Sequence, residues 1–149
     1  MNYTDLNFLV VDDDDAILEI VAAGIATFGA TKITKCPDGI LATQALSNPS
    51  QKIDCVISDY NMTPITGLKL LADIRTGRYA HLARDLPFII LTTSDEDDVL
   101  QAARQLDVSA YVLKPVPRES LASALKRATS RKLELKSAED YTAIKIATE

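Results

Sequence analysis

Residues 53–67 read IDCVISDYNMTPITG, and this stretch decides how the rest of the chain is interpreted. Its apolar run, residues 53–58, predicts a buried strand. The run ends abruptly at the carboxylate of Asp59, and a turn-prone loop leads on to a helix that we expect to begin near Gly67. The stretch therefore predicts a strand, a loop and a helix, with one acidic side chain at the carboxyl end of the strand.

The same order of strand and helix recurs along the chain. Apolar runs at residues 8–11, 53–58, 88–91 and 110–113 predict four strands, and the alternating stretch at residues 31–36 predicts a fifth. Apolar positions at helical spacing follow each run, within residues 17–28, 40–46, 68–74, 99–103 and 121–128. Such alternation is typical of a parallel sheet with right-handed crossovers and helices on both faces. We therefore expect an α/β fold with a doubly wound five-stranded parallel sheet.

Several helix boundaries are marked by polar residues. Asp14 or Asp15 is suited to cap the first helix, and Gly29 to end it. Residues 94–97, Ser-Asp-Glu-Asp, resemble a cap and an acidic first turn of the fourth helix, which we expect to bury Val99, Leu100 and Ala103. These signals support the helices that the periodicity predicts.

Composition excludes several classes of protein. The 149 residues carry a formal charge of -5, which argues against a nucleic-acid surface, since binding phosphate backbones requires clustered Lys and Arg. The N-terminus lacks the basic and apolar regions of a signal peptide, and no apolar run approaches the roughly 20 residues of a membrane span. We expect a cytoplasmic protein that binds neither nucleic acid nor membrane, with Cys36 and Cys55 as buried free thiols and His81 on the surface.

Polar side chains stand at the ends of four predicted strands. Asp12 and Asp13 follow the first strand, Asp59 the third, Thr92 the fourth and Lys114 the fifth. In open parallel sheets the functional crevice lies at the carboxyl ends of the strands. We therefore expect these side chains to meet in one cleft.

This set of side chains favours metal-assisted phosphoryl chemistry. Three neighbouring carboxylates repel one another, and Mg²⁺, which prefers oxygen ligands, relieves that repulsion. An aspartate such as Asp59 can attack phosphorus to form an aspartyl phosphate. Lys114, Thr92 and the metal would then stabilise negative charge on the transferred group.

Four motifs at the ends of predicted strands resemble the receiver domain of two-component response regulators, in its stand-alone, chemotaxis-regulator-like form. They are Val-Val-Asp12-Asp13, Ile-Ser-Asp59-Tyr-Asn61-Met62, Leu-Thr92 and Tyr111-Val-Leu-Lys114-Pro115, and the resemblance covers about residues 7–131. It implies a flavodoxin-like strand order, 2-1-3-4-5. It also implies a phosphoprotein in a phosphorelay, which catalyses only its own phosphorylation and dephosphorylation and is otherwise not an enzyme.

The resemblance assigns a role to each matching residue. Asp59 would take the phosphoryl group from a sensor histidine kinase or a histidine phosphotransfer protein. Asp12, Asp13, Asp59 and the backbone carbonyl of Asn61 would hold Mg²⁺. Thr92 and Tyr111 would act as a switch that alters the face formed by the fourth helix, fifth strand and last helix, where a downstream protein binds. Lys114 would pair with the phosphoryl group, and its bond to Pro115 would be cis.

Two residues depart from the family pattern. The family commonly has Met-Pro after the phosphorylated aspartate, whereas Thr63 separates Met62 from Pro64 here. The loop is therefore expected to take a different path. Thr93 stands where the family usually has a small residue, and a larger side chain there would restrict access to the acyl phosphate or slow its hydrolysis.

Other interpretations of the same residues remain open. A calcium loop is disfavoured because Ile17 stands where glycine is required. A haloacid-dehalogenase-type phosphatase also uses an aspartate, Mg²⁺, Thr or Ser and Lys, but Ala16 replaces its expected threonine. A degenerate receiver that acts only as a docking module would keep the fold without the chemistry. Tyr111 is also compatible with a core aromatic residue.

The C-terminal residues are expected to form a separate tail. The predicted receiver domain covers residues 1–132, and residues 133–149 form a short tail without an output domain. Tail residues 141–146 have some β character, compatible with pairing at a sheet edge, with passive packing or with disorder. We expect signalling by protein contact or onward phosphotransfer, from a monomer or a weak phosphorylation-dependent dimer.

Overall fold

The computed structural model describes residues 3–93, 97–130, 132–144 and 146. Strands and helices alternate along this part of the chain, and a short helix follows the last repeat. In order they are β1 (Asn7–Val11), α1 (Asp15–Thr27), β2 (Lys32–Cys36), α2 (Gly39–Ser47), β3 (Cys55–Asp59), α3 (Gly67–Arg75), β4 (Phe88–Thr92), α4 (Asp97–Gln105), β5 (Ala110–Leu113), α5 (Arg118–Ser130) and α6 (Ala138–Thr142).

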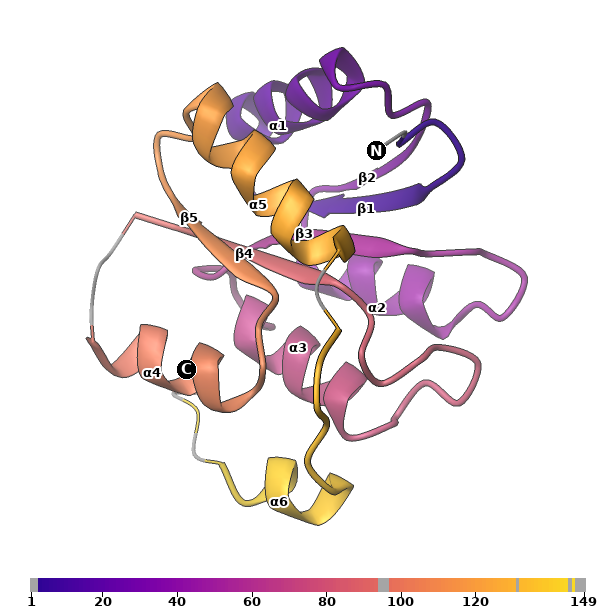
Figure 1. The fold of residues 1–149 in the computed structure, drawn as a ribbon, viewed down its shortest axis with the longest axis vertical. Coiled ribbons are helices and arrows are strands. Elements are labelled where there is room, and N and C mark those ends of the chain that lie inside the picture. Colours follow the sequence, from indigo (N-terminus) through magenta and orange to yellow (C-terminus); the bar gives the residue numbers. More distant parts are fainter. Residues whose placement is uncertain (1–2, 94–96, 131, 145, 147–149) are drawn as a thin grey trace.

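The strands form one parallel sheet in the order β2-β1-β3-β4-β5. Figure 1 shows α1 and α5 on one face of this sheet and α2, α3 and α4 on the other. The doubly wound fold and its strand order are therefore confirmed. The register pairs Val11 with Ser58, Asp59 with Leu91, and Thr92 with Leu113, so the carboxyl ends of these strands lie along one edge.

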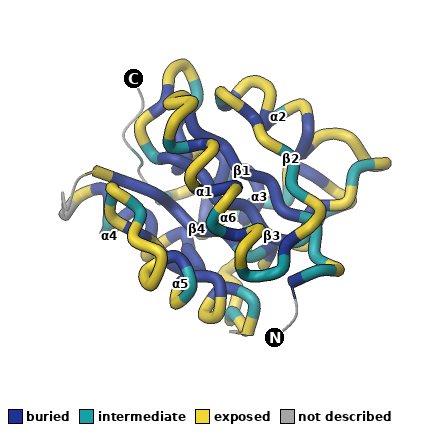
Figure 2. The backbone as a smooth tube through the Cα atoms, turned by 90° about the horizontal axis from the view of Figure 1, so that it is seen from above, coloured by how far each residue is buried: buried dark blue, intermediate teal, exposed yellow. Residues whose placement is uncertain are grey.

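A separate apolar core lies on each face of the sheet. Alternate strand residues point to opposite faces. Leu9, Val56 and Ile90 pack with α2 and α3, whereas Val10, Ile57 and Ile89 pack with α1 and α5. Figure 2 shows the central strands β3 and β4 buried, while the helices alternate between buried and exposed turns. The outer strands β2 and β5 include exposed residues. The rigid sheet therefore fixes the residues that follow its strands.

Local polar contacts start the helices where the sequence indicates. The side chain of Asp14 accepts hydrogen bonds from the backbone nitrogens of Ala16 (2.9 Å) and Ile17 (3.2 Å), which confirms the first cap. Gly29 follows α1 with a φ of 107°, a conformation that favours glycine. The predicted cap at residues 94–96 lies outside the described residues. In α4, Val99 and Ala103 are buried as expected, but Leu100 is only half-buried.

The two cysteines and the single histidine lie where the sequence predicts. Cys36 and Cys55 are free and buried, and burial raises the pKa of their thiols to about 11 and about 12. His81 is exposed. Among the described residues, none of the helices combines the length and apolar character that crossing a bilayer requires.

Part of the tail, Ala138–Thr142, forms the short helix α6 and does not pair at a sheet edge, so of the predicted alternatives the structure supports packing against the domain. Ser137 caps α6 by accepting a hydrogen bond from the backbone nitrogen of Asp140 (3.1 Å), and Glu139 and Asp140 place acidic side chains in the first turn. These start signals outweigh the β-branched residues that follow. Tyr141 is only 1% exposed and belongs to the core between the sheet and α3.

Candidate functional site

Asp12 is held immediately beyond β1. Its backbone nitrogen donates to the carbonyl of Cys36 at 3.2 Å, which extends the pairing with β2 by one residue. Its carboxylate oxygen Oδ1 accepts a hydrogen bond from the backbone nitrogen of Asp14 at 2.9 Å. The side chain is fully buried, so its second oxygen, Oδ2, must be satisfied inside the site.

Lys114 joins the ends of three strands. Its ammonium nitrogen lies 2.9 Å from Oδ2 of Asp12 and 3.1 Å from Oδ1 of Asp59. Oδ2 of Asp12 makes no aligned hydrogen bond, and its contact with the ammonium group is one of charge. The predicted convergence of these residues is therefore confirmed. A single cation here faces two buried carboxylates.

Burial and neighbouring charges shift the pKa values of Asp59 and Lys114. Burial, followed by the charge of Asp12, raises the pKa of Asp59 to about 6, while the charge and hydrogen bond of Lys114 act in the opposite direction. Burial lowers the pKa of Lys114, but the close contact with Asp12 and the charges of both aspartates outweigh it and raise that pKa. At neutral pH, Asp59 is therefore mostly ionised and Lys114 remains a cation.

Asp12, Asp13 and Asp59 form a cluster that suits a divalent cation. One carboxylate oxygen from each lies within 4.8 Å of the others. Asp13 is exposed, whereas Asp12 and Asp59 are buried, so the cluster opens to solvent on one side. All-oxygen ligands and excess negative charge fit Mg²⁺ or Ca²⁺ better than a softer metal. The incompletely satisfied Oδ2 of Asp12 supports the same fit.

Thr92 is placed beside Asp59 by the sheet register. Asp59 pairs with Leu91, and Thr92 is the next residue of β4 and its last. Its side chain is 2% exposed, and its carbonyl accepts a hydrogen bond from the backbone nitrogen of Lys114 at 2.7 Å. The neighbouring Thr93 is exposed. Thr92 therefore ends the strand that lies between Asp59 on β3 and Lys114, which follows β5 and contacts Asp59.

The loop after Asp59 departs from a simple turn. The backbone nitrogen of Asn61 donates to Oδ1 of Asp59 at 3.3 Å. Met62 is 1% exposed, and the peptide bond between Thr63 and Pro64 is cis. The bond between Lys114 and Pro115 is also cis, as the resemblance implied. That the Asn61 carbonyl binds a metal stays a prediction.

Gly67 has a second role that the sequence did not reveal. Its backbone nitrogen donates to the carbonyl of Tyr60 at 3.0 Å, and a Cβ atom at this position would overlap the carbonyl oxygen of Asp59. The sequence identified this residue only as a helix start. Glycine here allows the loop to close tightly against the strand end, which helps to fix Asp59.

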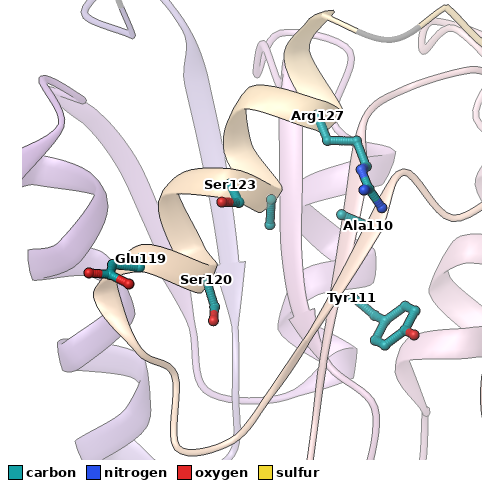
Figure 3. A pocket seen from close by; sticks show the side chains of 7 residues that line it. Ala110, Tyr111, Glu119, Ser120, Ser123 and Arg127 are labelled. Carbon is teal, nitrogen blue, oxygen red and sulfur yellow. The ribbon is translucent and has the colours of Figure 1, made fainter.

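Tyr111 is not a core residue in this structure. Its side chain is 38% exposed, because the residues of β5 alternate between buried and exposed. Figure 3 shows its ring directed away from α5, at one end of a cavity of about 430 Å³ between β5 and α5. The lining of this cavity includes Glu119, Ser123 and Arg127 but none of the acidic cluster. The core interpretation of Tyr111 is therefore wrong here.

The chain is thus a doubly wound α/β protein with three aspartates and one lysine gathered at the carboxyl ends of its strands. Residues 8–126 match the family described as the response regulator receiver domain. The chain belongs to this family.

Individual relatives agree with this assignment. The chain is 28% identical over 127 residues to the chemotaxis protein CheY of Pseudomonas aeruginosa, covering 85% of this chain and 98% of CheY. It is 29% identical over 125 residues to the transcriptional regulatory protein GlrR of Escherichia coli K12, covering 84% of this chain but only 26% of GlrR. The chain thus spans about a quarter of the length of GlrR.

A solved structure shows the same fold. The receiver domain of a sensor histidine kinase from Pseudomonas aeruginosa PAO1 matches with a TM-score of 0.70 and 23% identity, covering 85% of this chain and 98% of that one. That receiver domain has a magnesium ion coordinated in its active site cleft.

Proposed function

We propose that this chain is a response regulator that accepts a phosphoryl group on Asp59 from a phosphohistidine of a sensor histidine kinase or a histidine phosphotransfer protein. The observation that carries the proposal is the position of the Lys114 ammonium group, 3.1 Å from Asp59 and 2.9 Å from Asp12. A buried carboxylate beside a fixed cation is suited both to attack phosphorus and to have its product neutralised.

The reaction is a displacement at phosphorus. An ionised oxygen of Asp59 forms a new bond to phosphorus, and the bond between phosphorus and the donor's imidazole nitrogen breaks. The electron pair stays on that nitrogen, which leaves as neutral imidazole once a proton balances it. Asp59 becomes an acyl phosphate, and Lys114 lies close enough to offset part of its negative charge. Water later hydrolyses the acyl phosphate and restores the carboxylate.

Asp12, Asp13, Asp59 and the carbonyl of Asn61 would hold Mg²⁺ at this site. Their oxygen donors fit that ion, and a magnesium ion occupies the cleft of the similar receiver domain from Pseudomonas aeruginosa. When bound, Mg²⁺ would neutralise charge on the carboxylates and on the transferred group. Asp12 then holds Lys114 in place through their 2.9 Å contact, and the Asn61 backbone nitrogen orients Asp59.

Thr92 and Tyr111 would communicate the charge on Asp59 to partners. Thr92 lies beside Asp59 in the sheet, and Tyr111 is exposed on the neighbouring strand. The altered surface of α4, β5 and α5 would bind a downstream protein, or the phosphoryl group would pass onward. We further propose that the chain acts in the cytoplasm as a single receiver domain, either as a monomer or as a weak phosphorylation-dependent dimer.

The two alternative functions have less support. Membership of the receiver family favours phosphoryl acceptance over turnover by a phosphatase. A docking module without chemistry would not need a lysine bridging two buried aspartates, yet this chain has that contact. The exposed Thr93, which follows Thr92 directly, would alter the lifetime of the acyl phosphate.

Phosphotransfer from a labelled histidine kinase tests the proposal. We expect label to leave the kinase and to appear on this chain, and the Asp59→Asn variant to remain unlabelled. Asp98→Asn, which changes an exposed aspartate of α4, provides the control and should accept label normally. Steady release of phosphate from a phosphomonoester, without labelled protein, would support the phosphatase instead.

A further inference from the structure

The segment that follows α5 returns beneath the sheet and is anchored there by Tyr141. This side chain is 1% exposed, and its hydroxyl group donates a hydrogen bond of 2.6 Å to Oδ2 of Asp107, in the loop between α4 and β5. The same hydroxyl accepts a hydrogen bond from the backbone nitrogen of Lys136 at 3.1 Å. Figure 1 shows α6 below α3 and α4, and α3 contacts it directly. The anchor therefore joins the C-terminal segment to the end of α4.

Lys136 makes a second connection to the same loop. Its ammonium nitrogen lies 3.0 Å from Oδ2 of Asp107 and 2.8 Å from the carbonyl oxygen of Gln105, the last residue of α4. A cation at the C-terminal end of a helix is also favoured by the helix dipole. The C-terminal segment thus contacts both the end of α4, at Gln105, and the loop between α4 and β5, at Asp107.

Two arginines connect this attachment to α3. The buried guanidinium of Arg75 donates to four backbone carbonyls, those of Leu106, Arg84, Leu86 and Asp107, at 2.7–3.1 Å. Arg84 donates to the carbonyl of Lys136 at 2.6 Å. The loops before β4 and β5 are therefore held to each other and to the C-terminal segment.

The attached loop leads directly to the proposed phosphoryl site. Only β5, residues Ala110–Leu113, separates this loop from Lys114, and α4 connects it to the end of β4 at Thr92. The structure also has Tyr111 exposed on β5. Resting on the proposed function, we infer that residues 132–144 form a strap that holds α4 and β5 in the arrangement seen here and opposes the change that phosphorylation of Asp59 favours.

The direction of this coupling follows from linkage. A contact that is stronger in one of two arrangements shifts the equilibrium toward that arrangement by its difference in free energy. In the arrangement seen here, in which Tyr111 is exposed, the strap contacts the loop between α4 and β5 through Asp107. By reciprocity, phosphorylation should loosen the strap, and weakening the strap should increase the affinity of the site for a phosphoryl group or its mimic.

Hydrogen exchange of the unmodified chain gives the first test. Backbone amides of residues 137–144 should exchange at least about threefold faster when Mg²⁺ and beryllofluoride, a phosphoryl mimic, saturate Asp59, since exchange follows local opening. Unchanged or slower exchange in this segment would overturn the inference. No binding of beryllofluoride at Asp59 would instead contradict the proposed function, and the inference would fall with it.

Two substitutions give the second test. Tyr141→Phe removes one hydroxyl group and keeps the buried ring, while Asp107→Asn removes the charge and tolerates the φ of 54° found at this position. Each variant should bind beryllofluoride about fivefold more tightly, the change expected from losing about one hydrogen bond.

Tyr3→Phe is the matched control, since Tyr3 is a buried tyrosine in the core on the other face of the sheet. Its beryllofluoride affinity should equal that of the unmodified chain. If both strap variants also bind beryllofluoride with unchanged affinity, the segment is only a structural support and the inference is wrong.

Discussion

The ammonium nitrogen of Lys114 lies 3.1 Å from a carboxylate oxygen of Asp59, although 55 residues separate the two along the chain. Each residue stands at or just after the end of a strand, Asp59 ending β3 and Lys114 following β5. The strand order places β4 between these two strands, so the contact passes over the carboxyl end of β4, at Thr92. The sheet therefore fixes the positions of both side chains.

Divalent metal should stabilise the protein through the acidic cluster. At a Mg²⁺ concentration ten times the dissociation constant, the free energy of unfolding should rise by about 1.4 kcal/mol. Asp13→Asn should weaken Mg²⁺ binding at least about tenfold without unfolding the chain, because Asp13 is exposed and provides charge to the cluster. Thermal unfolding with and without Mg²⁺ measures both effects. Asp5→Asn, at another exposed aspartate, should leave the stabilisation unchanged, and equal effects of the two substitutions would contradict the site.

The raised pKa of Asp59 should make stability depend on pH in the absence of metal. The folded chain holds the proton of Asp59 up to a pKa of about 6, above the ordinary value of 3.8 for the carboxyl group, and therefore binds more protons than the unfolded chain between these values. Stability should fall as pH rises through this window, and the penalty should be complete above pH 6.

Asp59→Asn removes that penalty. In chelator, it should raise the free energy of unfolding at pH 7 by about 1–3 kcal/mol, and the gain should vanish below about pH 4. Urea unfolding across this range is the measurement. The exposed Asp98→Asn should show no such pH-dependent gain, and a gain for Asp59→Asn that is equal at pH 4 and pH 7 would disprove the assignment.

Arg75 should be among the most sensitive positions for folding. It is fully buried and donates to four carbonyls, so Arg75→Lys leaves several of them without a donor while keeping a buried charge. We expect a loss of about 3–5 kcal/mol in urea unfolding. The same change at the exposed Arg104 of α4 should cost less than about 0.5 kcal/mol. Similar losses at both positions would show that the carbonyl contacts of Arg75 are unimportant.

Gly67 should resist substitution because of its contact with the strand end. Gly67→Ala places a methyl group against the backbone carbonyl of Asp59, which cannot rotate away, and should cost about 1–3 kcal/mol. Gly24→Ala is the control, because its methyl group would meet only the terminal Cδ2 of Leu121, at 2.9 Å. Helix propensity also favours that change. Urea unfolding that gives equal costs for the two glycines would contradict the close approach.

The sequence predicted the elements that repeat. Four of the five strands, β1, β3, β4 and β5, are short, mainly apolar runs with a polar residue at or just after their end. The alternation with helices leaves little choice of topology. The meeting of Asp12, Asp59 and Lys114 followed from this topology, since parallel strands bring their carboxyl ends to one edge. Local patterns were therefore sufficient to place a side chain in the site wherever that residue stands at the end of a strand.

The features that the sequence did not predict depend on contacts between distant loops. Arg75 resembles an ordinary basic residue at a helix end, and nothing local indicates that loops at residues 84–86 and 106–107 supply its partners. Tyr141 has β propensity, yet Ser137 and the acidic residues after it start a helix that buries the ring. Tyr111 is exposed because it lies on the edge strand β5, where the residues alternate between the α5 side and solvent.

Phosphorylation with acetyl phosphate and Mg²⁺ tests the central claim most directly, because it needs no cognate kinase. Intact-mass measurement, followed by mass spectrometry of peptides, reports how many phosphoryl groups are bound and where. We expect one group per chain, located on Asp59, and none on the Asp59→Asn variant. A chain that stays unmodified under these conditions, or that carries its phosphoryl group on another residue, would contradict the assignment of Asp59 as the phosphoryl acceptor.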